Sequence, residues 1–119
     1  MQTRTTHSSL PTIQAWWTEI NNQLGLFLSV LASGQSIPDS DVDVAMQYIM
    51  TRLPQIQAMT PPAQMVEVHQ ELVSSLENMK QSLLYRQQDN TLIAQARYDI
   101  ARVNIDSVRF HLLRYGIMI

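Results

Sequence analysis

The chain has 119 residues, a formal net charge of −2 and no cysteine. This length suits a single domain with its own hydrophobic core, and the lack of cysteine excludes disulfides, thiolate zinc sites and cysteine nucleophiles. The nearly balanced charge lacks the basic excess that binds nucleic acid, so we expect no nucleic-acid partner.

The longest apolar run covers residues 24–32, LGLFLSVLA. It has about half of the ~20 residues that a membrane-spanning helix needs, so we expect no membrane insertion. The run resembles the core of a signal peptide, but a polar segment containing Glu19 precedes it, and we interpret it as part of a core helix. The sequence does not indicate the compartment. The protein is either cytoplasmic or the mature part of an exported bacterial protein.

Residues 1–9 are polar and unpatterned, and we expect them to form a frayed or disordered arm. Ser9 can cap a helix, Pro11 suits a first helical turn and Gly34 suits a helix end, which together predict a helix over residues 10–33. The apolar stripe of this helix, at helical spacing, comprises Ile13, Trp17, Ile20, Leu24, Phe27, Leu28 and Leu31.

A second helix is predicted over residues 39–58, with short polar and acidic residues at the start, where the helix dipole favours them. Its apolar stripe comprises Val42, Ala45, Met46, Ile49, Leu53 and Ile56. The stripe keeps its phase across Pro54, which predicts a kinked but continuous helix. A break after Leu53 is the alternative.

Two further helices are predicted over residues 61–88 and 90–115. The first begins with a Thr-Pro-Pro sequence, and the second follows an Asp-Asn pair, either member of which can cap it. No segment alternates apolar and polar residues in the manner of a β-strand. The sequence therefore predicts an all-α fold, an antiparallel up-down-up-down four-helix bundle in one domain over residues 10–119.

The sequence motifs of catalysis and of cofactor binding are missing. The three glycines are isolated, whereas a nucleotide-binding loop needs several together. Glu67 and Glu71 lack the histidine three residues later that di-iron bundles use, and His-Glu-x-x-His does not occur. No spacing indicates a nucleophile with its base. We therefore expect neither enzyme activity nor a cofactor.

One polar residue, His69, occupies the apolar seam of the third helix. The seam follows steps of four and three residues and comprises Met65, His69, Leu72, Leu76, Met79 and Leu83, so His69 is predicted to point inward. A hairpin between the third and fourth helices pairs residues whose numbers add up to about 179, which places His111 level with His69. Together with Asn104, the two histidines form the predicted polar core layer.

Two interpretations of this layer are open. In the first, the histidines bond to each other, to backbone carbonyls or to water, and fix the register of the helices. In the second, His69 and His111 hold a transition metal, or a histidine and Met50 ligate haem, with Trp16 and Trp17 as apolar walls. Polar core residues in bundles are more often structural, so we predict no metal site and keep the two histidines as candidates for the alternative.

The fourth helix is apolar on two sides. One line comprises Ile93, Ala96, Ile100, Val103 and Phe110, and the other comprises Ala94, Tyr98, Ala101, Ile105, Val108 and Leu112. Because no helix is central in a four-helix bundle, one line is expected to meet a partner. We predict a homodimer interface at Tyr98, Ile105, Val108 and Leu112, with Trp16 as a further interface residue. The alternative is that neighbouring side chains and the arm cover this second line.

These features predict a non-enzymatic helical-bundle protein that acts through protein–protein interaction or self-association. The expected partner is a second copy bound through the fourth helix, or an unknown protein. The alternative is a bundle that binds a small ligand, haem or a metal at the layer of His69 and His111.

Overall fold

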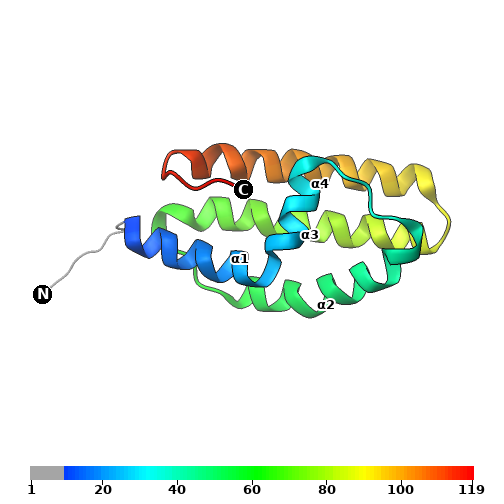
Figure 1. Cartoon of the computed structure of the whole chain (residues 1–119), viewed down its shortest axis with the longest axis horizontal. Helices are drawn as coiled ribbons and strands as arrows, with labels where there is room; N and C mark the ends of the chain where they lie inside the picture. The colour runs from blue at the N-terminus through cyan, green and yellow to red at the C-terminus, as the bar shows by residue number, and fades with distance from the viewer. Residues whose placement is uncertain (1–9) are drawn as a thin grey trace, which may run out of the picture.

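The computed structural model describes residues 10–119 and is an all-α four-helix bundle over this part of the chain (Figure 1). The predicted arm and the Ser9 cap lie outside the described residues. Four α-helices and two short 3₁₀ turns follow one another: α1 Leu10–Ser33, η2 Asp39–Asp41, α2 Val42–Ala58, η3 Ala63–Met65, α3 Val66–Gln87 and α4 Thr91–Leu113. No strand occurs among the described residues.

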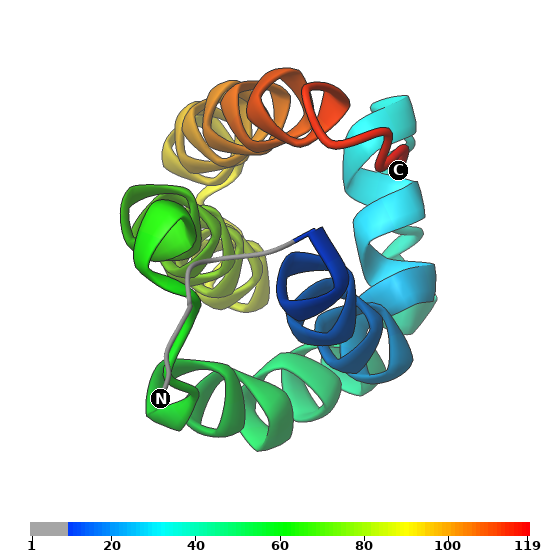
Figure 2. The ribbon, with the colours of Figure 1, turned by 90° about the vertical axis from the view of Figure 1, so that its left-hand side faces the viewer.

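Successive helices run in opposite directions, so the bundle has the predicted up-down-up-down order (Figure 1). It is elongated, with extents of 56 × 24 × 19 Å. Figure 2 shows α3 and α4 side by side, whereas the C-terminal half of α1 rises from α2 toward α4. The two ends of α1 therefore meet different neighbours.

Three helices end in the same hydrogen-bonded turn, which requires a residue with positive φ. At the end of α1, Gly34 has a φ of +74°, and the amides of Gly34 and Gln35 donate to the carbonyls of Leu31 and Val30. Gly116 ends α4 in this way with a φ of 71°. The turn after α3 places Asp89 at a φ of 58°, a conformation that strains a residue with a Cβ.

The second helix is continuous through Pro54, so a break after Leu53 is wrong. At the start of α4 the Asn90 side chain accepts a hydrogen bond from the Ile93 amide at 3.4 Å, which makes Asn90 the cap. The predicted starts of the second and third helices at residues 39 and 61 lie too early, because 3₁₀ turns come first and α2 and α3 begin at Val42 and Val66 without a side-chain cap.

The core consists of the stripes that face inward from the four helices. The α1 stripe is buried from Ile13 to Leu31, and every residue of the predicted α3 seam is buried, including His69. These side chains join those of α2 and α4 in one continuous apolar cluster. A seam of this kind excludes water, so each polar group within it needs a partner inside the protein.

Small residues line the contact between α3 and α4. The hydroxyl of Ser75 donates to the carbonyl of Ala101 at 2.8 Å, and that of Ser82 donates to the carbonyl of Ala94 at 2.7 Å. Both serines and both alanines are buried and lie at seven-residue spacing on their helices. Short side chains let the two backbones approach closely, and the hydroxyls use carbonyl lone pairs that the helix leaves free.

Candidate functional sites around the histidines and the outer face of α4

His69 lies where α1, α2 and α3 meet, and both of its ring nitrogens have partners. The Trp16 indole N–H donates to Nδ1 at 3.1 Å, and Nε2 lies 2.9 Å from the carbonyl oxygen of Ile56. Because Nδ1 accepts a hydrogen bond, the proton of the neutral ring resides on Nε2, which donates to Ile56. The Trp16 and His69 rings are also in contact, with centroids 5.9 Å apart.

This arrangement favours the neutral form of the ring. Burial lowers the pKa of His69 below its ordinary value of 6.5, and the hydrogen bond to Ile56 opposes part of that effect. A second proton on the ring would point Nδ1–H at the Trp16 N–H, so protonation would break the pair. His69 is thus a structural residue that joins three helices.

His111 is not the partner of His69, and the predicted pair is wrong. Both ring nitrogens of His69 are bonded to Trp16 and Ile56 instead. His111 lines a cleft with Met65 and Val66 at the start of α3.

The polar strip of α4 contacts α3 outside the core rather than forming a central layer. The side chain of Asn104 donates to Glu71 at 2.7 Å, and the hydroxyl of Ser107 donates to the other oxygen of Glu71 at 3.2 Å. Further along, Arg97 donates to Asn78 at 3.2 Å. Asn104 and His111 are half-buried, so of the predicted polar core layer only His69 is fully buried.

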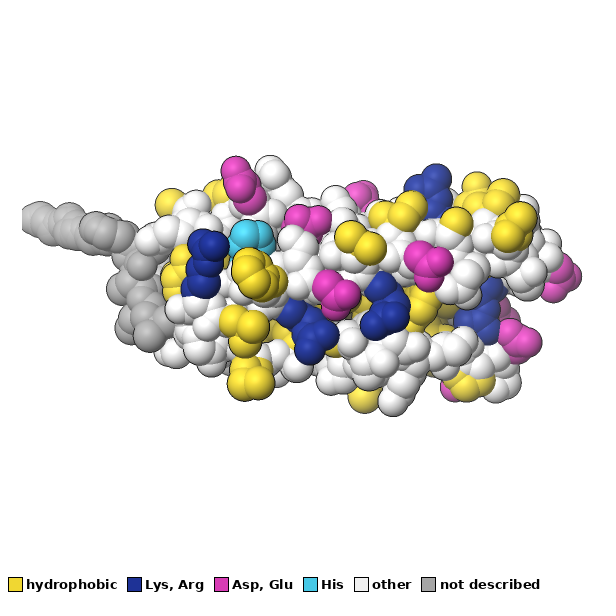
Figure 3. Space-filling view, turned by 90° about the horizontal axis from the view of Figure 1, so that it is seen from above, with side chains coloured by type: hydrophobic (Ala, Val, Ile, Leu, Met, Phe, Trp, Pro, Cys, Tyr) yellow, Lys and Arg dark blue, Asp and Glu magenta, His cyan; other side chains and the backbone are white. Residues whose placement is uncertain are grey.

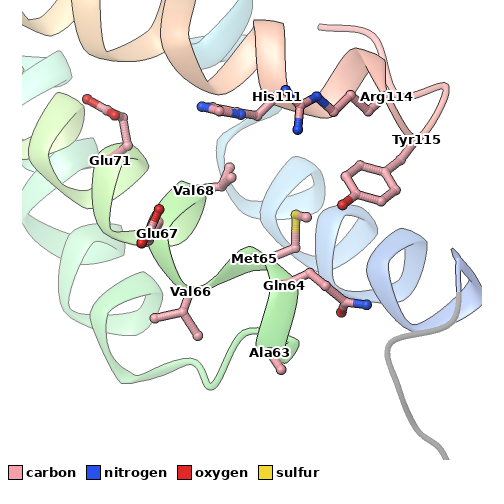
Figure 4. Close-up of a pocket in the computed structure, with 10 residues that line it drawn as sticks. All are labelled: Ala63, Gln64, Met65, Val66, Glu67, Val68, Glu71, His111, Arg114 and Tyr115. Atoms are coloured by element: carbon pink, nitrogen blue, oxygen red, sulfur yellow. The ribbon is translucent and has the colours of Figure 1, made fainter.

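A cleft of about 490 Å³ lies between the start of α3 and the end of α4, and His111 lines it (Figure 4). Glu67 and Glu71 line the α3 side, and Arg114 and Tyr115 line the other side with His111. Within residues 10–119, no group of three or more histidine, cysteine or acidic side chains is placed to hold a metal ion. Both nitrogens of His69 are bonded within the protein, so in this arrangement neither is free to ligate a metal or a haem iron.

The residues predicted to form the interface lie inside the monomer. Trp16, Ile105, Val108 and Leu112 are buried. Tyr98 is half-buried, and its hydroxyl donates to the carbonyl of Gln35 at 2.6 Å. Burial raises the pKa of that hydroxyl above its ordinary value of 10.0, which keeps it protonated as a donor. The predicted assignment of this line of α4 to the surface is therefore wrong.

The other apolar line of α4 faces outward. Its large side chains retain much of their accessible surface: Ile93 40%, Ile100 45%, Val103 67% and Phe110 64%. Figure 3, seen from above the molecule of Figure 1, shows hydrophobic side chains along this face with basic and acidic side chains among them. Ser107, half-buried and bonded to Glu71, continues the same spacing. We call residues 93, 96, 100, 103, 107 and 110 the outer seam of α4.

A signal in the sequence distinguishes the two lines. The buried line contains Ala94 and Ala101, and their spacing matches that of Ser75 and Ser82 on α3. Small residues at matching spacing mark the sides on which two helices approach closely, and this pattern places the second line inward.

A second apolar surface lies between α1 and α2. It is a groove of about 400 Å³ lined by residues that include Leu26, Phe27, Val30, Val44 and Tyr48. The Tyr48 ring stacks on Phe27 with centroids 5.7 Å apart, and its hydroxyl donates to the carbonyl of Gln23 at 2.7 Å. Leu26 and Val44 project at the edge of the groove and are exposed.

The chain matches no protein-family model, no curated protein and no solved structure. Its class therefore rests on its own structure, an all-α four-helix bundle with a doubly bonded core histidine. Among the described residues, no helix has the length and apolar character to cross a membrane.

Proposed function

We propose that this protein acts by binding protein, through self-association along the outer seam of α4, and not by catalysis. The observation that carries the proposal is the exposure of four large apolar side chains in helical register on one face. Scattered exposed apolar residues are ordinary on a protein surface, but an aligned series along a helix forms a contact surface for another helix.

The exposed seam has an unfavourable solvation energy that a partner would relieve. Burial of the exposed part of each large side chain would contribute roughly 1 kcal/mol, at about 25 cal/mol for each Å² of apolar surface. Several such contributions together support association in the micromolar range or weaker once the entropy of binding is subtracted. We therefore expect a reversible, concentration-dependent complex.

The test replaces Val103 by aspartate and compares the result with the same change at Val44. The two valines are 67% and 71% exposed, but Val103 lies on the outer seam and Val44 at the groove between α1 and α2. V103D should weaken self-association about tenfold or more, because a carboxylate would be buried against apolar groups, whereas V44D should leave it unchanged. Equal effects of both variants, or of neither, in sedimentation velocity would refute the location of the interface.

A second candidate function, binding of a small molecule, has support from the cleft around His111. Acidic side chains line its α3 side and Arg114 lines the opposite side, a charge pattern that suits a zwitterion such as a free amino acid. Titration with free amino acids, followed by the NMR signals of the His111 ring, should give a saturable shift and leave His69 unchanged. Linear or absent shifts of His111 would remove this candidate.

A further inference from the structure

We infer that the partner on the outer seam is a second copy of this chain and that the two α4 helices lie parallel and in register. This inference rests on the proposed self-association and adds the orientation and register of the two copies. The argument comes from the order of residues along the seam and along its two borders.

The outer seam has the spacing of a two-stranded coiled coil. Its positions follow steps of three, four, three, four and three: Ile93, Ala96, Ile100, Val103, Ser107 and Phe110. In heptad notation, Ile93, Ile100 and Ser107 occupy a positions, and the other three occupy d positions. In a parallel coiled coil, β-branched residues at a positions favour two strands over three or four.

The borders of the seam differ in charge. The border toward α3 carries Arg97, Asn104 and His111 at e positions, and two of them bond to α3 side chains. The opposite border carries Asp99 and Asp106 at g positions, where Gln95 donates to Asp99 at 2.8 Å and Arg109 pairs with Asp106 at 3.5 Å. Each face of the contact therefore has one acidic border and one border that is basic or carries hydrogen-bond donors.

In a parallel pair, the g border of one helix meets the e border of the other. Asp106 would then face His111 of the second copy, and Asp99 would face Asn104 of the second copy, so each carboxylate meets a donor. In an antiparallel pair, the g borders meet each other. Asp99 of each copy would then lie level with Asp106 of the other copy, which gives two such contacts. The repulsion of these carboxylates, weakened by the Arg109 partner of Asp106, disfavours the antiparallel arrangement.

The size of the seam sets the expected strength. The 23 residues of α4 give a contact ~35 Å long. One helix against another over this length buries less than the ~800 Å² per partner of a standard interface. The pair is therefore reversible, and a covalent trap at a chosen position is the sharpest test of its orientation.

Because the native chain has no cysteine, single cysteines report orientation directly. In the parallel pair, Ala96 meets Ala96 of the second copy, within the Cα separation of up to ~6.8 Å that a disulfide needs. In an antiparallel pair, Ala96 meets Ser107, and the two Ala96 positions lie ~16 Å apart. We expect A96C to form a disulfide dimer with itself in an oxidised-glutathione buffer. The matched control A58C, at an exposed alanine of α2, should form no more than the background of random collisions.

The outcomes separate this inference from the proposed function. Self-linked A96C supports both. A disulfide that forms only in a mixture of A96C with S107C would overturn the parallel orientation and leave self-association through α4 in place. Association in sedimentation without either disulfide would overturn the inference and move the interface away from α4. A monomer at every concentration, with no disulfide above the A58C background, would overturn both.

Discussion

The indole N–H of Trp16 donates a hydrogen bond to Nδ1 of His69 across 3.1 Å, inside the junction of α1, α2 and α3. The other ring nitrogen of His69, Nε2, donates a hydrogen bond to the carbonyl of Ile56, near the end of α2. The only histidine on a predicted core stripe thus joins three helices. Its directional hydrogen bonds fix the relative orientation of these helices more narrowly than apolar packing alone would.

Replacement of Trp16 by phenylalanine should destabilise the fold, because Nδ1 of His69 would remain buried without a donor. A lost partner of this kind costs about 1–3 kcal/mol. The neighbouring Trp17 is also buried and makes no hydrogen bond in the structure, so W17F removes a similar volume without that loss. Urea denaturation should show a lower free energy of unfolding for W16F than for W17F. Equal losses would show that the hydrogen bond contributes nothing.

The stability of the fold should fall as the pH is lowered below about 6.5. The pKa of His69 is lowered in the folded state, so between that pKa and 6.5 the unfolded chain binds more protons at this residue. The free energy of unfolding then rises with pH, and the contribution is complete above 6.5. H69Q should lose this part of the pH dependence in denaturation from about pH 5 to pH 8, whereas H111Q should retain it. A slope in H69Q equal to that of the native chain would contradict the assignment.

Replacement of Asp89 by glycine should stabilise the protein. Asp89 has a φ of 58°, where a Cβ is strained and glycine is not, and the gain should be about 0.5–1 kcal/mol after the greater freedom of unfolded glycine is subtracted. Gln88, one residue earlier, has a φ of −96° and should lose stability on the same change. Thermal denaturation of both variants measures the difference, and a lower melting temperature for D89G than for the native chain would contradict the strain.

The two glycines with positive φ should respond alike to alanine. Both changes strain the backbone by about 1–2 kcal/mol. A Cβ at Gly34 would meet only the flexible end of the Arg102 side chain, and a Cβ at Gly116 would have no atom within 4 Å. G34A and G116A should therefore lose similar stability in chemical denaturation. A much larger loss in G34A would show that the Arg102 side chain cannot move aside.

The inward stripes of the helices and several of their ends could be predicted because their signals are local. A cap, a glycine or a proline acts within one turn, and helical periodicity of apolar residues marks the buried face. Gly34 ends α1 and Asn90 caps α4 as the sequence indicates, and the seam that contains His69 is buried. Each of these features depends on residues that are near one another in the chain.

The rotation of α4 and the register of its pairing with α3 could not be derived from hairpin arithmetic. They depend on where Ser75 and Ser82 meet the α4 backbone, which is a contact between distant segments. His69 bonds to Trp16 and Ile56, whereas His111 lines a cleft at the start of α3. The same contact determines which of the two apolar lines of α4 faces the core, because it buries Ile105 and leaves Val103 exposed.

Sedimentation velocity of the native chain and V103D, from micromolar to millimolar concentration, tests the central claim that the outer seam of α4 mediates self-association. The native chain should shift from monomer to dimer as concentration rises, and V103D should remain monomeric at concentrations about tenfold or more above the native midpoint. A native chain that stays monomeric throughout, or a V103D variant that associates as well as the native chain, would contradict the claim.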